Sequence, residues 1–344
     1  ADLALHNLVN ADGVGHGHPS RAGPPAGVRG WYEDLLGRAD RQAGLKPDIL
    51  AARDAVAGFR DWLHENRPGM TASAGVGRAN FDWYLKHVKL MPYTVDDILA
   101  LGQRELDRLW SVYALEQHRN RDLPPLQLSA SAEDYAARLQ STDGHIRNFL
   151  VEHQILTVPD YVGKLDTNAP WIVRPGGPNF WEQVQFRDPH PDHLHAVIPG
   201  HRFDRLLAQN VDHPIRSRMF SGARAEGWAV YVEEGMLNAG VFDELPRVRE
   251  LIYIFGIFRA ARVSADVWLQ LNRKEVSEVV DYWMERVPYM DRNVARVDAE
   301  IYLRRPPGYG LGYTIGMLQM QHLLADRKRQ LGDAFVLKDF HDEF

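Results

Sequence analysis

The chain has 344 residues, enough for one large domain or two smaller ones, and 45% of them are hydrophobic, so it can bury a sizeable core. Its net charge is −6 and it has no long basic run, which argues against nucleic acid as a partner. The absence of cysteine excludes disulfides, thiolate metal sites and cysteine nucleophiles. No apolar run is long enough to cross a bilayer and no signal peptide is visible. The sequence therefore favours a cytoplasmic protein without a membrane partner.

Glycine and proline are concentrated in residues 12–27, which predicts a loop that separates an N-terminal segment, residues 1–30, from a domain over residues 31–344. Helical periodicity follows. Residues 94–118 have Thr94 as an N-cap, and a second helix begins after Ser131.

Residues 170–190 differ from the rest of the chain, because short aromatic and β-branched runs surround Pro-Gly-Gly and indicate a hairpin or an ordered loop. Beyond residue 200 the helical pattern returns, and we predict helices over residues 222–240, 245–272, 274–287 and 313–332. The helix over 245–272 is apolar on most sides and is expected to be central. The predicted fold is a single large, mostly α domain with a short β or loop insert near residues 170–190.

Two histidines flank a Pro-Gly break in the stretch HAVIPGH, where His195 and His201 stand six positions apart. On an unbroken helix the second side chain would point about 240° away from the first, so the two imidazoles would not converge. Pro199 and Gly200 remove this obstacle, because proline interrupts helical hydrogen bonds and glycine permits unusual backbone angles. The sequence therefore allows a bent pair of metal ligands, although its 15 scattered histidines make such pairs common by chance.

A zinc-type ion needs a further ligand from a separate element. Glu226 is the best candidate, since it lies 25 positions after His201 near the start of a predicted helix. Glu233 follows on the same helical face, roughly 10 Å further along the axis, and that distance suits a role behind the ligands or beside the substrate.

Several motifs carry a resemblance to a known family. Residues 195–201 are similar to its pattern of His-Glu, two small or apolar residues and Pro-Gly-His, and residues 226–229 match its Glu-Gly-Trp-Ala segment. Residues 307–316 supply its spaced Pro-Gly, Leu, Tyr and Gly. The family is the bacterial domain of unknown function 885, whose members look like mostly α-helical relatives of zinc metallopeptidases. The resemblance covers about residues 75–344.

This resemblance implies that His195, His201 and Glu226 bind a metal ion, zinc or another divalent transition metal. It also makes Tyr313 a candidate for contacting the substrate or a developing oxyanion. The other interpretation of Tyr313 is a core aromatic residue beside a glycine-rich turn.

The chain departs from the family pattern directly after the first histidine. The family glutamate there is expected to take a proton from metal-bound water, and this chain has Ala196. A second departure is the lack of a histidine around Trp268. We consider three explanations: a natural relative that kept the metal and changed its reaction, a metallopeptidase inactivated by deliberate Glu-to-Ala replacement, and a non-catalytic descendant that binds a ligand. The second departure favours the first explanation, because a single replacement would leave it unexplained.

If the chain has a substitute base, the nearest in sequence is His193, which would point to the same side as His195 if that segment were extended. Asp204, Glu233 and Tyr313 are weaker candidates for this role. The other interpretation of His193 is a surface residue.

We therefore expect a metal-dependent hydrolase or lyase that acts on a small peptide, an amide or an amino-acid-derived substrate. A non-hydrolytic biosynthetic step fits the absence of the glutamate. A ligand-binding protein on an inactive enzyme scaffold is one rival. A metal-free enzyme that uses Tyr313 with Arg262 or Arg305 is another. The sequence leaves the substrate, the metal and the oligomeric state open.

Overall fold

The computed structural model describes residues 2–9, 27–166, 170–219 and 221–344. Its residues form helices joined by loops, and no strand occurs within these ranges, so the predicted mostly α fold is confirmed. The glycine- and proline-rich loop predicted at residues 12–27 lies outside the described residues except for Gly27, where a helix begins.

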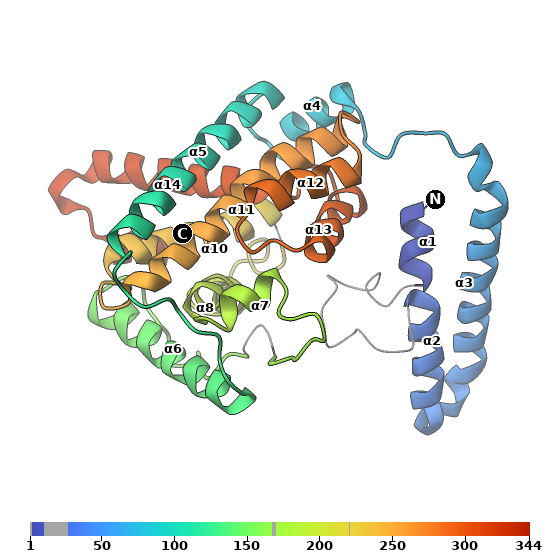
Figure 1. Cartoon of the computed structure of the whole chain (residues 1–344), viewed down its shortest axis with the longest axis horizontal. Coiled ribbons are helices and arrows are strands. Elements are labelled where there is room, and N and C mark those ends of the chain that lie inside the picture. Colours follow the sequence, from blue (N-terminus) through green and yellow to red (C-terminus); the bar gives the residue numbers. More distant parts are fainter. Residues whose placement is uncertain (1, 10–26, 167–169, 220) are drawn as a thin grey trace.

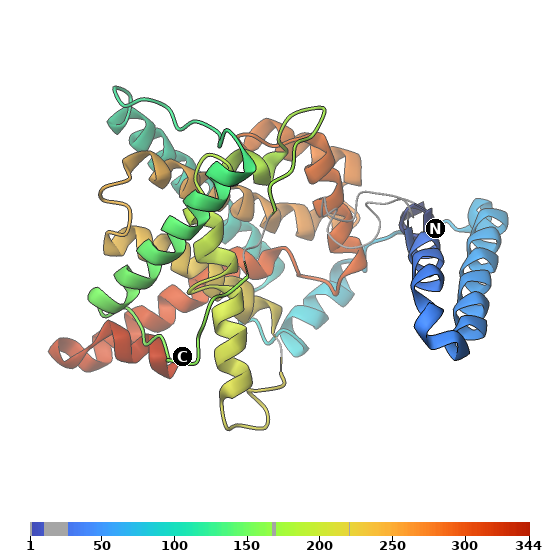
Figure 2. The ribbon, with the colours of Figure 1, turned by 90° about the horizontal axis from the view of Figure 1, so that it is seen from below.

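The N-terminal helices form a separate unit. They are α1 (Asp2–Val9), α2 (Gly27–Arg38) and α3 (Lys46–Asn66), with 3₁₀ turns at Ala39–Leu45 and Arg67–Gly69. Figures 1 and 2 both show α1, α2 and α3 beside one another and apart from the remaining helices. A small cluster that includes Leu5, Leu8 and Leu63 is buried between them. The predicted boundary between residues 30 and 31 falls within α2.

The remaining helices form the body that carries the candidate site. They are α4 (Arg78–His87), α5 (Val95–Arg119), α6 (Ala132–Glu152), α7 (Phe180–Gln185), α8 (His190–Ala196), α9 (His201–Asn210), α10 (Gly222–Ala239), α11 (Pro246–Gln270), α12 (Val276–Arg286), α13 (Arg292–Arg304), α14 (Leu311–Leu331) and α15 (Leu337–Glu343). The predicted caps are confirmed, because the Thr94 hydroxyl accepts from the backbone N–H of Asp97 and the Ser131 hydroxyl accepts from that of Asp134.

Helix α11 is central, as its apolar sequence predicted. Its side chains are buried along almost its whole length, and it packs against α5, α8, α10, α12, α13 and α14 (Figure 1). A helix that is apolar on most sides requires neighbours on most sides, and this body provides them. Even α11 lacks the combination of length and apolar character that crossing a membrane requires, and so does every other helix in the described ranges.

Helices α10 and α14 approach each other through glycine. A Cβ atom on Gly227 would lie 2.5 Å from the carbonyl carbon of Gly316, and one on Gly316 would lie 2.3 Å from the carbonyl oxygen of Ala223. Any side chain at either glycine would force the two backbones apart. The EGWA and GYTIG segments are therefore the contact that brings the first turns of α10 and α14 together.

The predicted insert near residues 170–190 contains no hairpin in its described part. Residues 170–179 form a loop, and α7 begins after Asn179, whose side chain accepts from the backbone N–H of Glu182 while Glu182 bonds back to the Asn179 N–H. This capping box and the local packing outweigh the β propensity of the aromatic runs, so the ordered loop is correct and the β alternative is wrong.

Replacing Gly227 with alanine tests the glycine contact. We expect Gly227→Ala to lower the free energy of unfolding by about 2–3 kcal/mol, because the added methyl group overpacks against the α14 backbone. Gly235→Ala in the same helix is the matched control, since its Cβ would meet nothing closer than 3.9 Å. The control should be neutral or stabilising by up to about 1 kcal/mol, because alanine favours helix over glycine. Urea unfolding of both variants gives the comparison, and equal stabilities would contradict the proposed contact.

Candidate metal centre

A tight bend joins the two histidine-bearing helices. His195 lies in the last turn of α8 and His201 is the first residue of α9. The chain folds back so closely that a Cβ atom on Gly200 would lie 1.8 Å from the carbonyl oxygen of His195, so only glycine fits there. The buried indole N–H of Trp228 donates to the carbonyl of Pro199 at 2.8 Å. This bond fastens the bend to α10.

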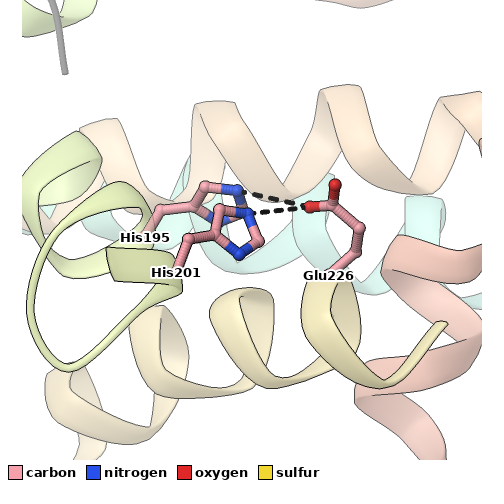
Figure 3. Close-up of side chains that lie close together, drawn as sticks. All are labelled: His195, His201 and Glu226. Atoms are coloured by element: carbon pink, nitrogen blue, oxygen red, sulfur yellow. Dashed lines mark hydrogen bonds and ion pairs between the residues drawn. The ribbon is translucent and has the colours of Figure 1, made fainter. Parts of the chain in front are cut away.

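The bend brings both imidazoles to the carboxylate of Glu226 in the first half of α10. Oε2 of Glu226 is 3.0 Å from Nε2 of His201 and 3.7 Å from Nε2 of His195 (Figure 3). The two rings are nearly perpendicular, with centroids 4.7 Å apart. One donor atom from each residue lies within 4.8 Å of the other two.

This donor set fits a transition-metal ion. Two imidazoles and one carboxylate are a ligand combination of catalytic zinc sites, which keep a further position open. Ligands held about 2 Å from a tetrahedral ion lie about 3.3 Å apart, close to the separations between Glu226 and the two histidines. The His201 side chain is 33% exposed, whereas those of His195 and Glu226 are 11% and 12% exposed. The cluster is therefore accessible from the His201 side.

The charges within the cluster support one another. Burial opposes ionisation of Glu226, but hydrogen bonds and charge from His195 and His201 outweigh it and hold the pKa of this carboxyl well below its usual value. Burial and Arg259 disfavour a charged His195, yet Glu233 and Glu226 prevail and raise the pKa of this imidazole. The burial that opposes each of these two charges is thus offset by the opposite charges of its neighbours.

Glu233 orients His195 from behind. Oε1 of Glu233 is 2.6 Å from Nδ1 of His195 and 2.8 Å from Nη2 of Arg259, and both partners are buried. This ion-pair contact places a carboxylate on one ring nitrogen of His195, while the other ring nitrogen faces Glu226. The position of Glu233 agrees with the role behind the ligands that its helical spacing predicted.

Two tyrosine hydroxyls border the cluster. The Tyr313 hydroxyl is 2.8 Å from that of Tyr309, and Tyr309 donates to Oε1 of Glu226 at 3.4 Å. The Tyr313 ring lies nearly parallel to His195, with centroids 6.4 Å apart. Burial and the negative charge of Glu226 raise the pKa of Tyr309 to about 12, so its hydroxyl keeps its proton at neutral pH. Sequence analysis missed Tyr309, although it lies four positions before Tyr313 in the same motif.

A buried arginine packs against the ring of Tyr313. The Arg262 guanidinium lies 4.4 Å from the Tyr313 ring centroid and makes two 2.9 Å bonds to the Asp298 carboxylate. The charge of Arg262 is thus already paired. Arg305 lies over the Tyr309 ring at 4.5 Å. In this arrangement both arginines contact the faces of the tyrosine rings.

His193 does not face the cluster. The hypothesis that it replaces the missing base required an extended segment, and that premise is wrong because residues 190–196 form α8. On a helix, positions two apart point in different directions. Nε2 of His193 instead lies 2.9 Å from Asp143 of α6. Among the weaker candidates, Asp204 binds Arg224 through both oxygens at 2.7 Å.

Ala196 contributes no polar group to the site. Its side chain is 5% exposed and belongs to the main hydrophobic core. A buried methyl group therefore stands directly after the first of the two histidines.

The family comparison agrees with the motifs. Residues 193–344 match the family described as "Bacterial protein of unknown function (DUF885)". This segment contains His195, His201 and Glu226, and it is shorter than the range of about residues 75–344 over which the sequence motifs resemble the family. No curated protein matches the sequence.

Two solved structures share the fold. One, described as a "putative lipoprotein of unknown function" from Shewanella oneidensis, has a TM-score of 0.69 at 19% identity and is matched over 90% of this chain and 66% of its own. The other, described as a "putative lipoprotein" from Colwellia psychrerythraea, has a TM-score of 0.70 at 18% identity, over 91% of this chain and 62% of its own. The chain thus spans slightly less than two thirds of the length of each protein.

Asp266 of α11 binds the backbone at the start of α14. The residues it binds lie between Tyr309 and Tyr313 in the sequence. Its Oδ2 accepts from the backbone N–H of Gly310 at 2.7 Å and from that of Leu311 at 3.3 Å, and the residue is fully buried. Burial raises its pKa to about 7, although these bonds oppose the shift.

This raised pKa predicts a pH dependence of stability. Between about pH 4 and 7 the unfolded chain has an ionised Asp266 while the folded protein keeps it protonated, so stability falls as pH rises through this window. The loss is on the order of 3–4 kcal/mol and levels off above pH 7. Asp266→Asn should remove this component. Urea unfolding of both proteins at several pH values measures it, and parallel curves would contradict the expectation.

Proposed function

We propose that this protein is a metal-dependent enzyme on a zinc-metallopeptidase-like scaffold, in which His195, His201 and Glu226 bind the ion. The observation that supports it most directly is the convergence of two imidazole nitrogens and one carboxylate oxygen within 4.8 Å, accessible from one side. The carboxylate behind His195 is a second feature that metal-binding histidines share.

A bound Zn²⁺ or similar divalent ion would polarise a substrate carbonyl. The chain's own groups would then stabilise charge on that oxygen. The Tyr309 hydroxyl, protonated at neutral pH, lies at the edge of the cluster and would turn its proton from Glu226 to that oxygen, while its oxygen accepts from Tyr313. Preorganised donors of this kind stabilise an oxyanion in a site with little water.

The lack of a general base beside the proposed metal ion limits the types of reaction that the site could catalyse. Ala196 has no titratable group, His193 is held by Asp143, and Glu233 is held between His195 and Arg259. Without a carboxylate after the first histidine, activation of water for hydrolysis is disfavoured. We therefore favour a non-hydrolytic step, such as a lyase reaction, on a small peptide, an amide or an amino-acid-derived molecule.

Ala196 also supports a second candidate. A metallopeptidase that lost its glutamate, by deliberate replacement or during descent to a ligand-binding protein, would keep the same metal ligands. This candidate differs in having no turnover.

The two structural neighbours also bear on where the protein is located in the cell. Both are described as candidate lipoproteins. By this likeness we favour the cell envelope over the cytoplasm that the sequence alone suggested.

The proposed ligands predict metal content. Purified protein loaded with Zn²⁺ and desalted should retain about one ion per chain, and His195→Ala or Glu226→Ala should retain almost none. His322→Ala is the matched control, because that side chain is 71% exposed and lies far along α14. Elemental analysis of the four proteins measures the outcome. Equal zinc in all of them would end the proposal.

Restoring the glutamate separates the candidates. If the natural reaction is not hydrolysis, the zinc-loaded wild type should hydrolyse no peptide in a library of short peptides, and Ala196→Glu should gain at most trace activity, because the new carboxylate replaces a buried methyl group. Liquid chromatography of the products measures this. Vigorous hydrolysis by Ala196→Glu, with Ala196→Gln inactive, would favour the disabled metallopeptidase instead.

A further inference from the structure

Arg259 is a buried cation that contacts the candidate metal centre only through Glu233. It lies on α11 and is 3% exposed. Its Nη2 is 2.8 Å from Oε1 of Glu233, the same oxygen that lies 2.6 Å from Nδ1 of His195. Its Nε and Nη1 have no hydrogen-bond partner within the described ranges. An unpaired, buried guanidinium N–H is costly, so a further partner is expected.

Arg259 also lines a small cavity. Its volume is about 20 Å³, and Glu233, Arg259 and Thr314 line it together with apolar residues such as Leu109 and Met317. A water molecule needs roughly 10–15 Å³ and two to four polar partners. The cavity therefore has the size and the polar groups that one water requires.

The charges around the cavity disfavour an anion. Three carboxylates, of Glu105, Glu233 and Glu234, line it. Both Glu105 and Glu234 share a single cation, Arg108, whose Nη2 lies 2.6 Å and 2.7 Å from their oxygens. A bound anion would face more negative than positive charge, whereas a water can accept from Arg259 and donate to Glu233.

We infer that this cavity holds one ordered water bound to Arg259 and Glu233, and that Arg259 and this water position Glu233 against His195. The water site is independent of any metal. The positioning role rests on the proposed function, since it acts through a proposed ligand.

Crystallography tests the water site. A crystal structure at a resolution that resolves ordered water should show one density peak within hydrogen-bond distance of Arg259 in the cavity. A parallel crystal soaked in bromide should show no anomalous signal there. A cavity without density overturns the site, and a bromide signal overturns the assignment to water.

A double-mutant cycle tests the positioning role. Zn²⁺ affinity, measured by competition with a chromophoric chelator, should fall about 10-fold or more in Glu233→Gln and in Arg259→Met, since groups behind metal ligands have effects of this size. Because Arg259 acts through Glu233, the double variant should bind no more weakly than Glu233→Gln alone. A purely structural effect of Arg259→Met would instead add its full loss to that of Glu233→Gln, and this result overturns the role.

Two further variants keep the cycle interpretable. Arg259→Lys retains the charge and should recover part of the affinity, also where Arg259→Met folds poorly. Arg329→Met on the exposed part of α14 is the control and should bind zinc like the wild type. A wild type that binds no zinc overturns the proposed function and the positioning role together, while the density map still decides the water.

Discussion

The backbone contact between Gly227 and Gly316 determines where the candidate metal centre lies. It lets α10 and α14 approach more closely than any side chains would allow. The residues beside this contact belong to the candidate metal centre. Glu226 precedes one glycine and Tyr313 lies three positions before the other. A wider crossing would separate the carboxylate from the tyrosines. The same short segment adds Trp228, whose bond to Pro199 holds the histidine bend. The candidate ligand Glu226, the helix contact Gly227 and the anchor Trp228 are thus consecutive residues.

In the candidate metal centre, acidic and basic side chains alternate in a row of contacts that extends into the core. Glu226 contacts both imidazoles, His195 contacts Glu233, and Glu233 contacts Arg259. Burial disfavours an isolated charge at each of these positions, so each group depends on its neighbour for compensation. This mutual dependence explains why the pKa values of Glu226 and His195 move in opposite directions from their usual values.

Ala196 lies beside the candidate metal centre and leaves its scaffold intact. A methyl group packs into the hydrophobic core directly after the first ligand, while the bend, the second histidine and the carboxylate from α10 are all in place. The fold is shared with proteins that are less than 20% identical, which shows that this framework tolerates extensive substitution. Under the proposed function, this donor geometry without a carboxylate beside it would suit a reaction that needs a polarised carbonyl more than an activated water.

Local signals predicted much of this structure. The caps at Thr94 and Ser131, the long apolar helix over residues 245–272 and the Pro-Gly break were all readable, because they depend on neighbours within one or two turns. The β alternative near residue 175 was wrong, because a capping box decided the local structure against aromatic propensity. The predicted direction of the His193 side chain was also wrong, because residues 190–196 form a helix and the prediction assumed an extended segment.

The sequence by itself determined which residues could bind a metal and that a bend would be needed to join them. Only the tertiary structure decided that they meet, that Glu233 and Arg259 lie behind them, and that Tyr309 borders them. These contacts join α8, α9 and α10, which follow one another in the chain, to α11 and to the turn before α14, which lie further along the sequence. Their distances depend on how closely the helices pack, and periodicity along one helix carries no information about that packing.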